Sequence, residues 1–299
     1  MARNEGSGGR SKGAPLVQPV GGGVFVAGQD SRGGVGMELG LRDRVAAVAA
    51  ASQGMGRAIA REMSAEGARV SICARRGEPL RAAARAIQAE TQGEVLPVVG
   101  DVAREPDATR FIAETARHFG RLDILVVNAG GPPTGTFDAL ADAAWDAAYA
   151  LTLKSAVHLI RAAVPHMRAR TWGRVIALTS ISVKQPLDNL VLSNAFRMAV
   201  VGLVKTLARE LAPDGILVNA ISPGYVGTDR MADVLEAGAK ATGRSIDAVR
   251  KEQIRDVPLG RFGEPSEIAA LAAFLASERA SYITGAIVQV DGGLYRGVY

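Results

Sequence analysis

The fold is decided by one stretch of small residues, Ala49-Ala50-Ala51-Ser52-Gln53-Gly54-Met55-Gly56-Arg57. It follows an apolar run and opens an amphipathic pattern, so we expect a turn between a strand and a helix. In such a turn the backbone can approach a phosphate closely, and the first N–H groups of the helix bind it. We therefore predict that a nucleotide contacts Ser52, Gln53, Gly54, Met55 and Gly56. A turn of the same shape that binds no nucleotide is the alternative.

Apolar runs and amphipathic stretches alternate along the chain from Arg44 onward. The runs predicted as strands are Val45–Ala49, Arg69–Cys73, Glu94–Val99, Leu122–Val127, Arg174–Leu178, Ile216–Ile221 and Ala286–Val290. The stretches predicted as helices are 57–66, 77–92, 105–118, 142–169, 190–212 and 264–276. This alternation favours βαβ crossovers, and strands that are near-continuous in apolar residues agree with burial on both faces. We predict an α/β fold with a doubly wound parallel sheet in a single domain, with its ligand at the carboxyl ends of the strands.

The composition is that of an ordinary globular protein. The chain has 299 residues, 48% hydrophobic and 22% charged, which is enough to build a large core. The net charge of +5 is small for this length and the Lys and Arg residues are dispersed, so we expect no nucleic-acid partner. We find no apolar run long enough to span a bilayer and expect no membrane partner. The three His residues lack the spacing of metal ligands, so no metal is expected.

Residues 1–36 differ in composition from the rest of the chain. They are rich in Gly, Ser and polar residues and show no apolar periodicity, which predicts a disordered tail. They also lack the basic start and apolar core of a secretory signal. The single Cys73 lies inside an apolar run and cannot form an internal disulfide, which is typical of a cytoplasmic protein. We therefore expect a folded domain over 37–299, located in the cytoplasm.

Two cations follow the second predicted strand. Arg75 and Arg76 stand where the ribose of a dinucleotide would lie in this fold. A carboxylate there would hydrogen-bond the 2′-hydroxyl of NAD, whereas Arg accommodates the 2′-phosphate of NADP. The pair favours NADP(H) as the cofactor, with solvated surface arginines as the alternative.

Further stretches at strand ends carry a common pattern: Asp101-Val102, Asn128-Ala129-Gly130, Arg174–Ser180, Asn219–Thr228 and Ser281–Gly293. Together with the Gly-rich turn they resemble motifs of the short-chain dehydrogenase/reductase family, in its 3-oxoacyl-acyl-carrier-protein-reductase-like branch, over residues 41–296. The resemblance implies a Rossmann-like oxidoreductase and assigns cofactor contacts to Asp101, Val102, Asn128, Ala129, Gly130, Pro223, Gly224 and Thr228. The turn departs from the family pattern, because Ala49 and Ala50 replace a Thr and a Gly, and a Cβ at Ala50 restricts φ.

The chemistry that the resemblance implies rests on four residues, Asn, Ser, Tyr and Lys. Ser180 matches the Ser that polarises the carbonyl. Ser193 stands where the family has the proton-donating Tyr, Arg197 where it has the Lys, and Thr152 where it has the Asn. A Ser hydroxyl is shorter and a much weaker acid than a phenol, whose pKa is about 10. Arg197 keeps a positive charge able to bind the nicotinamide ribose but cannot give up a proton. The catalytic candidates are therefore Ser180, Ser193 and Arg197.

Three functions are compatible with this altered set. The first is an NADP(H)-dependent oxidoreductase for a small carbonyl, with Lys184, Tyr225 or a water as the proton donor, or for an activated, imine-like substrate that needs no acid. The second is a non-redox lyase or cyclase on the same fold. The third is a catalytically inactive subunit that partners an active relative. We expect the first, because Ser180 and the Pro223-Gly224 segment are retained.

Two further expectations concern the surroundings of the site. The segment 225–262 is long and helical in pattern, and we expect it to close over the nicotinamide as a substrate lid. The stretches 142–169 and 190–212 carry apolar faces broader than one sheet face needs. Similar proteins form tetramers through these helices, so we expect a homo-oligomer, either a tetramer or a dimer.

Overall fold

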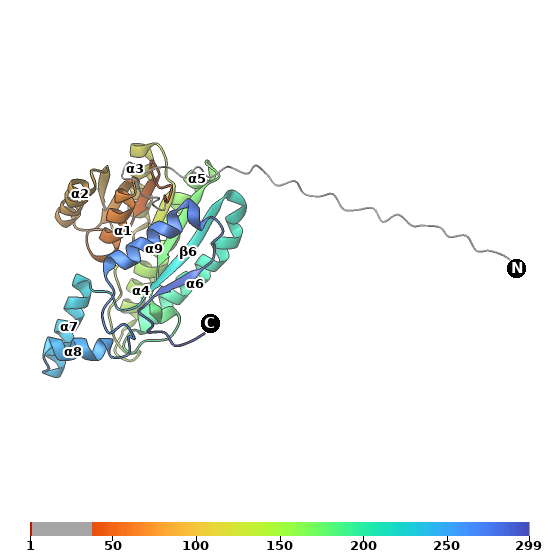
Figure 1. Ribbon diagram of the computed structural model, residues 1–299. Helices are drawn as coiled ribbons and strands as arrows, with labels where there is room; N and C mark the ends of the chain where they lie inside the picture. Colours follow the sequence, from red (N-terminus) through yellow and green to blue (C-terminus); the bar gives the residue numbers. More distant parts are fainter. Residues whose placement is uncertain (2–37, 299) are drawn as a thin grey trace, which may run out of the picture. The chain divides into compact units, whose positions relative to one another are not determined.

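The computed structural model describes Met1 and residues 38–298. One folded unit begins at Leu39, and within it helices flank a central sheet (Figure 1). Apart from Met1, the tail predicted over residues 1–36 lies outside the described residues, as does the predicted domain start at Met37.

The sheet has seven strands in the order β3-β2-β1-β4-β5-β6-β7, and every pair is parallel. The strands are β1 Val45–Val48, β2 Arg69–Ala74, β3 Val95–Val99, β4 Ile124–Val127, β5 Gly173–Leu178, β6 Ile216–Pro223 and β7 Ile287–Val290. The order runs outward from β1 in one direction and from β4 in the other, which creates a crevice at the carboxyl ends of these two strands. The predicted doubly wound parallel sheet is confirmed.

Helices follow most of the strands. They are α1 Gly54–Ala65, α2 Gly77–Thr91, α3 Glu105–Phe119, α4 Asp142–Tyr149, α5 Ser155–Arg168, α6 Val191–Glu210, α7 Asp229–Thr242, α8 Ile246–Ile254 and α9 Pro265–Ala276. The helix predicted over 142–169 is interrupted, because the π-helical turn Ala150–Lys154 joins α4 to α5. Single π-helical turns occur often at functional sites.

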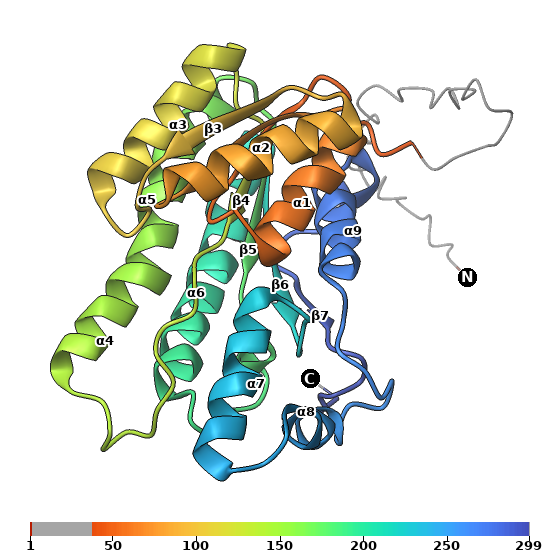
Figure 2. The ribbon, with the colours of Figure 1, turned by 90° about the vertical axis from the view of Figure 1, so that its left-hand side faces the viewer.

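The helices form a layer on each face of the sheet (Figure 2). On one face α1, α2 and α9 bury residues such as Ile59 and Ile268 against the strands. On the other face α3, α5 and α6 bury Phe111, Leu159 and Val204. Both faces of the strands are therefore covered, which explains why the strands are largely apolar.

α6 requires a correction to the sequence analysis. Within the described residues it is the one helix long and apolar enough to cross a membrane, with a mean hydropathy of 1.4. The expectation that no such apolar stretch exists is therefore wrong by this criterion. A core helix of a globular protein passes the same test, and α6 packs Val200 and Val204 into the core beneath the sheet. Only 28% of its apolar window is buried in this single chain, so an apolar surface remains exposed.

Candidate active site

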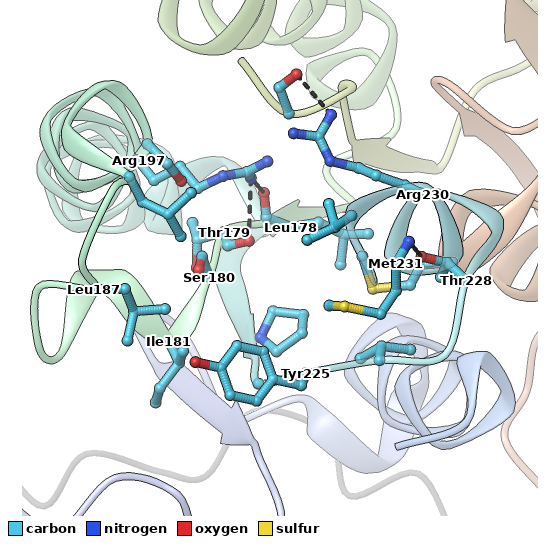
Figure 3. Close-up of a pocket in the computed structure, with 18 of the residues that line it drawn as sticks. Leu178, Thr179, Ser180, Ile181, Leu187, Arg197, Tyr225, Thr228, Arg230 and Met231 are labelled. Carbon is cyan, nitrogen blue, oxygen red and sulfur yellow. Dashed lines mark hydrogen bonds between the residues drawn. The ribbon is translucent and has the colours of Figure 1, made fainter. Parts of the chain in front are cut away.

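A cavity of about 1090 Å³ opens where the central strands end. Its wall includes residues that follow β1, β4, β5 and β6, residues of α6, and the first turn of α7 (Figure 3). The crevice at the carboxyl ends of the strands is the usual ligand site of this architecture. The volume is at the upper end of the range for ligand pockets, so it can hold part of a cofactor together with a small substrate.

Most of the predicted site residues line this cavity: Gln53, Gly54, Met55, Gly56, Asn128, Ala129, Gly130, Ser180, Ser193, Arg197, Pro223, Gly224 and Thr228. The predicted residues that do not line it are Ser52, Arg75, Arg76, Asp101 and Val102. The last four follow β2 and β3, on one side of the crevice. The cavity therefore unites the positions expected around the diphosphate and the nicotinamide, while those expected around the adenosine lie beside it.

Asn128 holds the Gly-rich turn against the end of β4. Its Nδ2 donates to the carbonyl oxygens of Ala49 and Ala50, each at 3.2 Å. A Cβ at Gly56 would lie 2.5 Å from the Ala50 carbonyl oxygen and 2.8 Å from Asn128 Nδ2, so only glycine fits there. The N-terminus of α1 has no side-chain cap and no acidic residue in its first turn, which leaves its N–H groups to an anion. The turn therefore fits a diphosphate.

Ala50 adopts a backbone conformation that non-glycine residues rarely adopt. Its φ is +48°, in the left-handed region. An L-residue with a Cβ loses about 1–2 kcal/mol in this region relative to the right-handed one. Ala50 also lines the cavity, so the strain lies directly at the candidate cofactor site.

The two arginines after β2 are exposed and carry no ion pair with any carboxylate in the described part of the chain. Arg76 Nη2 makes one long contact, 3.5 Å, with Gln53 Oε1 of the Gly-rich turn. Asp101, after β3, accepts a hydrogen bond from the backbone N–H of Ala103 at 3.1 Å. Two unpaired cations beside the turn fit a phosphate on the ribose.

Ser180, Ser193 and Arg197 come together on one wall of the cavity. Ser180 Oγ accepts a hydrogen bond from the Ser182 N–H at 3.1 Å, because Ser180 caps a short 3₁₀ turn. The carbonyl oxygen of Ser180 accepts one from Ser222 Oγ at 2.7 Å, which fixes the end of β5 to β6. Ser193 is 92% buried, since its exposed fraction is 8%. The structure thus places the predicted catalytic candidates at one site, held by backbone contacts.

Arg197 projects from α6 across the end of β5. Its Nη1 donates to the carbonyl oxygens of Leu178, at 3.0 Å, and Thr179, at 3.1 Å. No carboxylate of the described residues forms an ion pair with it. Burial, and secondly the positive charge of Arg230, lower the pKa of Arg197 to about 10. The guanidinium therefore remains charged at neutral pH, without a counter-ion.

Arg230 is the residue of the site that the sequence analysis missed. It lies in the first turn of α7, and its Nη1 and Nη2 donate to the carbonyl oxygens of Gly131, at 2.8 Å, and Pro132, at 3.0 Å. Figure 3 shows its side chain and that of Arg197 extending toward each other from opposite walls. The sequence signal that could have identified it is its position two residues after Thr228, a predicted cofactor contact.

The two predicted side-chain proton donors are placed differently. Tyr225 lines the cavity, and Lys184 does not. Burial, and secondly the Asp256 carboxylate, raise the pKa of Tyr225, so its phenol stays protonated at neutral pH. Thr152, at the position of the family Asn, lies in the π-helical turn and does not line the cavity. Its Oγ1 is buried with no hydrogen-bond partner among the described residues.

Gly224 and Thr228 form the wall after β6. A Cβ at Gly224 would lie 2.8 Å from the Cα of Asp291, so the backbone segments meet at a distance only glycine allows. Thr228 caps α7 by accepting a hydrogen bond from the Met231 N–H at 3.4 Å. From the segment 225–262, Met231, Val234, Glu252, Gln253 and Asp256 also line the cavity.

Cys73 lies in the core of the sheet, away from the cavity lining. Cys73 is buried within β2, and burial raises the pKa of its thiol to about 12, so it is not a thiolate at neutral pH. Within this part of the chain no group of three or more His, Cys, Asp and Glu residues is arranged to hold a metal ion.

Comparisons with known proteins agree with this geometry. A family model described as enoyl-(acyl carrier protein) reductase matches residues 49–295. Dehydrogenase/reductase SDR family member 4 from Sus scrofa is 36% identical over 258 residues, which cover 85% of this chain and 88% of that protein. The 3-oxoacyl-(acyl-carrier-protein) reductase FabG from Staphylococcus epidermidis is 34% identical over 254 residues, 85% of this chain and 99% of that protein. L-sorbose reductase from Gluconobacter frateurii, solved with NADPH and L-sorbose, has a TM-score of 0.84 and 35% identity, and covers 88% of this chain and 100% of that one.

Proposed function

Because the chain belongs to the short-chain dehydrogenase/reductase family, we propose that it is an NADP(H)-dependent oxidoreductase that acts on a small carbonyl compound. The observation that carries the proposal is that the Gly-rich turn, Ser180 and Arg197 face one cavity. A cofactor held at the turn and a carbonyl group beside Ser180 would therefore be neighbours. The same wall would also place a hydroxyl and a cation next to the reacting group.

NADP(H) fits the residues at the turn and beside it. The Gly-rich turn and the uncapped N-terminus of α1 would hold the diphosphate. Arg75 and Arg76 would pair with the 2′-phosphate. Gly224 and Thr228, on the wall after β6, would face the nicotinamide. When bound, the cofactor supplies or accepts a hydride.

The residues of the site would orient the carbonyl and stabilise negative charge on its oxygen. Ser180 would donate a hydrogen bond to that oxygen, and Arg197 would add a positive charge whose attraction for the oxygen is stronger in a buried site. Ser193 cannot replace the family phenol as an acid, so the proton would come from Tyr225 or from water. We expect slow reduction of simple ketones for this reason.

The two cations in the cavity, Arg197 and Arg230, favour a substrate without positive charge at the reacting group. Arg197 and Arg230 would repel a positively charged iminium ion, whereas they would attract the oxygen of a carbonyl on which negative charge develops. We therefore prefer the carbonyl substrate over the imine-like one. A lyase or cyclase and an inactive partner subunit are the alternatives that the following experiment tests.

The test combines cofactor binding with turnover. Titration should show NADPH binding more tightly than NADH, and a simple 3-oxoacyl ester should be reduced very slowly, because a missing general acid costs about 10²–10⁴-fold. Ser180→Ala should remove most of the remaining rate while leaving NADPH binding unchanged. The combined variant Thr152→Asn, Ser193→Tyr and Arg197→Lys should raise ketone reduction. Rapid turnover by the unmodified protein would contradict the role given to the missing phenol. A lack of NADPH binding at millimolar concentration would favour the alternatives.

We also propose that the protein acts in the cytoplasm as a homo-oligomer, a tetramer or a dimer, through α4, α5 and α6. Phe137, Tyr149 and Met198 have exposed fractions of 69%, 43% and 48%. Trp145 and Phe196 link the first two of these in a series of aromatic ring contacts between α4 and α6. Exposed apolar side chains of this kind are typical of an interface, and a second copy of the chain is the expected partner.

The segment 225–262 is proposed as the substrate lid. Its helices α7 and α8 lie beyond the end of β6, and Met231, Val234 and Gln253 contribute to the cavity wall. Movement of this segment would open or close the cavity while the Gly-rich turn stays in place.

A further inference from the structure

We propose that the substrate carries a carboxylate, and that Arg197 and Arg230 bind it from opposite walls of the cavity. This inference rests on the proposed function and adds the chemical class of the substrate. Neither the family resemblance nor the relatives assign an anion site to these two residues.

The first support is the arrangement of the two guanidinium groups. Arg197 comes from α6 and Arg230 from α7, and Figure 3 shows them pointing toward each other over the cavity. Each is held by two backbone carbonyl oxygens, those of Leu178 and Thr179 for Arg197, and those of Gly131 and Pro132 for Arg230. A guanidinium has five N–H donors, so each group keeps donors that no residue of the described chain satisfies. Such anchoring reduces the entropy lost when a ligand is bound.

The second support is the absence of a counter-ion within residues 38–298. No carboxylate lies within ion-pair distance of Arg197 or Arg230 in this part of the chain. Two acidic residues do line the cavity near α8, but they are engaged with other arginines. Glu252 pairs with Arg244, and Asp256 with Arg296 at 3.3 Å. A third, Asp188, pairs with neither member of the arginine pair. Two like charges that repel each other at one end of a cavity are stabilised by an anion placed between them.

The position of Arg197 favours the substrate over the cofactor as the source of the anion, whereas Arg230 is anchored beside Gly130, a predicted cofactor contact. Arg197 is held at the end of β5 by the carbonyl oxygen of Thr179, the residue before Ser180. Ser180 marks the end of the proposed site where the carbonyl would react. The diphosphate has its own fitted place at the Gly-rich turn and the α1 N-terminus. A planar carboxylate also matches the paired donors of a guanidinium, which gives a short bidentate contact. The cofactor diphosphate is the competing source, and the experiment separates the two.

The experiment measures ligand binding by calorimetry on the unmodified protein and on single variants. The probes are acetoacetate, levulinate and phenylpyruvate, each compared with its uncharged methyl ester. We expect at least one acid to bind about tenfold or more tightly than its ester, as a charge-assisted hydrogen bond would give. Arg230→Gln should remove this preference and Arg230→Lys should keep part of it. The matched control is Arg250→Gln, which removes the same charge from α8, outside the cavity lining and without breaking an ion pair of the described residues, and should leave the preference in place.

Three outcomes would overturn the inference. One is that no acid binds more tightly than its ester. Another is that Arg250→Gln weakens acid binding as much as Arg230→Gln does. The third is that Arg230→Gln weakens the binding of NADPH or of inorganic pyrophosphate by the same factor as it weakens the binding of the acids. That result would show that the two arginines bind the cofactor. NADPH binding is measured in parallel, so failure of the proposed function, seen as no NADPH binding, is distinguishable from failure of the acid site.

Discussion

Replacement of Ala50 by glycine tests whether the Gly-rich turn is strained. Ala50 has a φ of +48°, which costs an alanine about 1–2 kcal/mol relative to the right-handed region. Glycine adopts this conformation without that cost, but it also gains about 0.4–1 kcal/mol of conformational freedom in the unfolded chain. The difference predicts that Ala50→Gly stabilises the protein by about 0.5–1 kcal/mol. For a domain of this size this corresponds to a rise of about 1–4 °C in the unfolding midpoint.

The assay is thermal and urea unfolding of the wild type, Ala50→Gly and the matched control Ala49→Gly. Ala49 is fully buried at the end of β1 and has no positive φ, so its replacement should destabilise by about 1–2 kcal/mol through lost burial and added chain entropy. NADPH affinity should not fall in Ala50→Gly, because the turn keeps its shape. If Ala50→Gly lowers the midpoint as much as Ala49→Gly does, the conformation of Ala50 is not strained.

Three other predictions concern the cofactor, the interface and acid stability. In a fluorescence titration, Arg76→Ala should weaken the binding of NADPH by about tenfold and leave the binding of NADH nearly unchanged. Equal losses of affinity for both cofactors would show that Arg76 does not bind the 2′-phosphate. Met198→Glu should lower the fraction of oligomer measured by light scattering, because it places a charge on the exposed apolar face of α6. Contacts with Arg261, and secondly with the Glu264 N–H, lower the pKa of Glu267 to about 2. Its contribution to stability is therefore present above its unfolded pKa of about 4.3 and lost as pH falls through about 2, so urea unfolding of wild type and Glu267→Gln should differ at pH 7 and converge near pH 2.

The sheet could be predicted from the sequence because buried parallel strands leave a simple signal. The predicted run Arg69–Cys73 differs from β2 by one residue at its end. The run Ile216–Ile221 was predicted too short, since β6 continues to Pro223. Ser222 and Pro223 extend it because they pair with Gln289 and Val290 of β7, and pairing with a distant strand is invisible in local periodicity.

The interruption between α4 and α5 could not be predicted in the same way. Apolar spacing over 142–169 is compatible with one continuous helix, and a π-helical turn inserts a single residue into that spacing. The pattern of Ala and Leu residues tolerates this shift. The structure therefore separates the two helices at Thr152, at a position that sequence spacing matched to the family Asn.

The candidate site shows where spacing is informative and where it is not. The positions of Ser180, Ser193 and Arg197 follow from fixed distances along one strand and one helix, and all three line the cavity. Lys184 is predicted as a proton donor near the site, but the short 3₁₀ turn Ile181–Val183 separates it from Ser180 and Lys184 does not line the cavity. Arg230 was missed because its anchors lie in the loop after β4, and no pattern along α7 reports the carbonyl oxygens of a distant loop.

Ser193 in place of Tyr and Arg197 in place of Lys, the two replacements on α6, are physically consistent with each other. In the family pattern the Lys serves the phenol, because its charge lowers the pKa of the Tyr one helical turn away. With Ser193 in place of the Tyr, a titratable amine would have no acidic group to act on. Arg197 instead binds the carbonyl oxygens of Leu178 and Thr179, and with a pKa of about 10 it stays charged at neutral pH. We therefore propose that the site has lost proton transfer at this position and kept the stabilisation of negative charge, which is the property that an acid substrate and a developing oxyanion would both use.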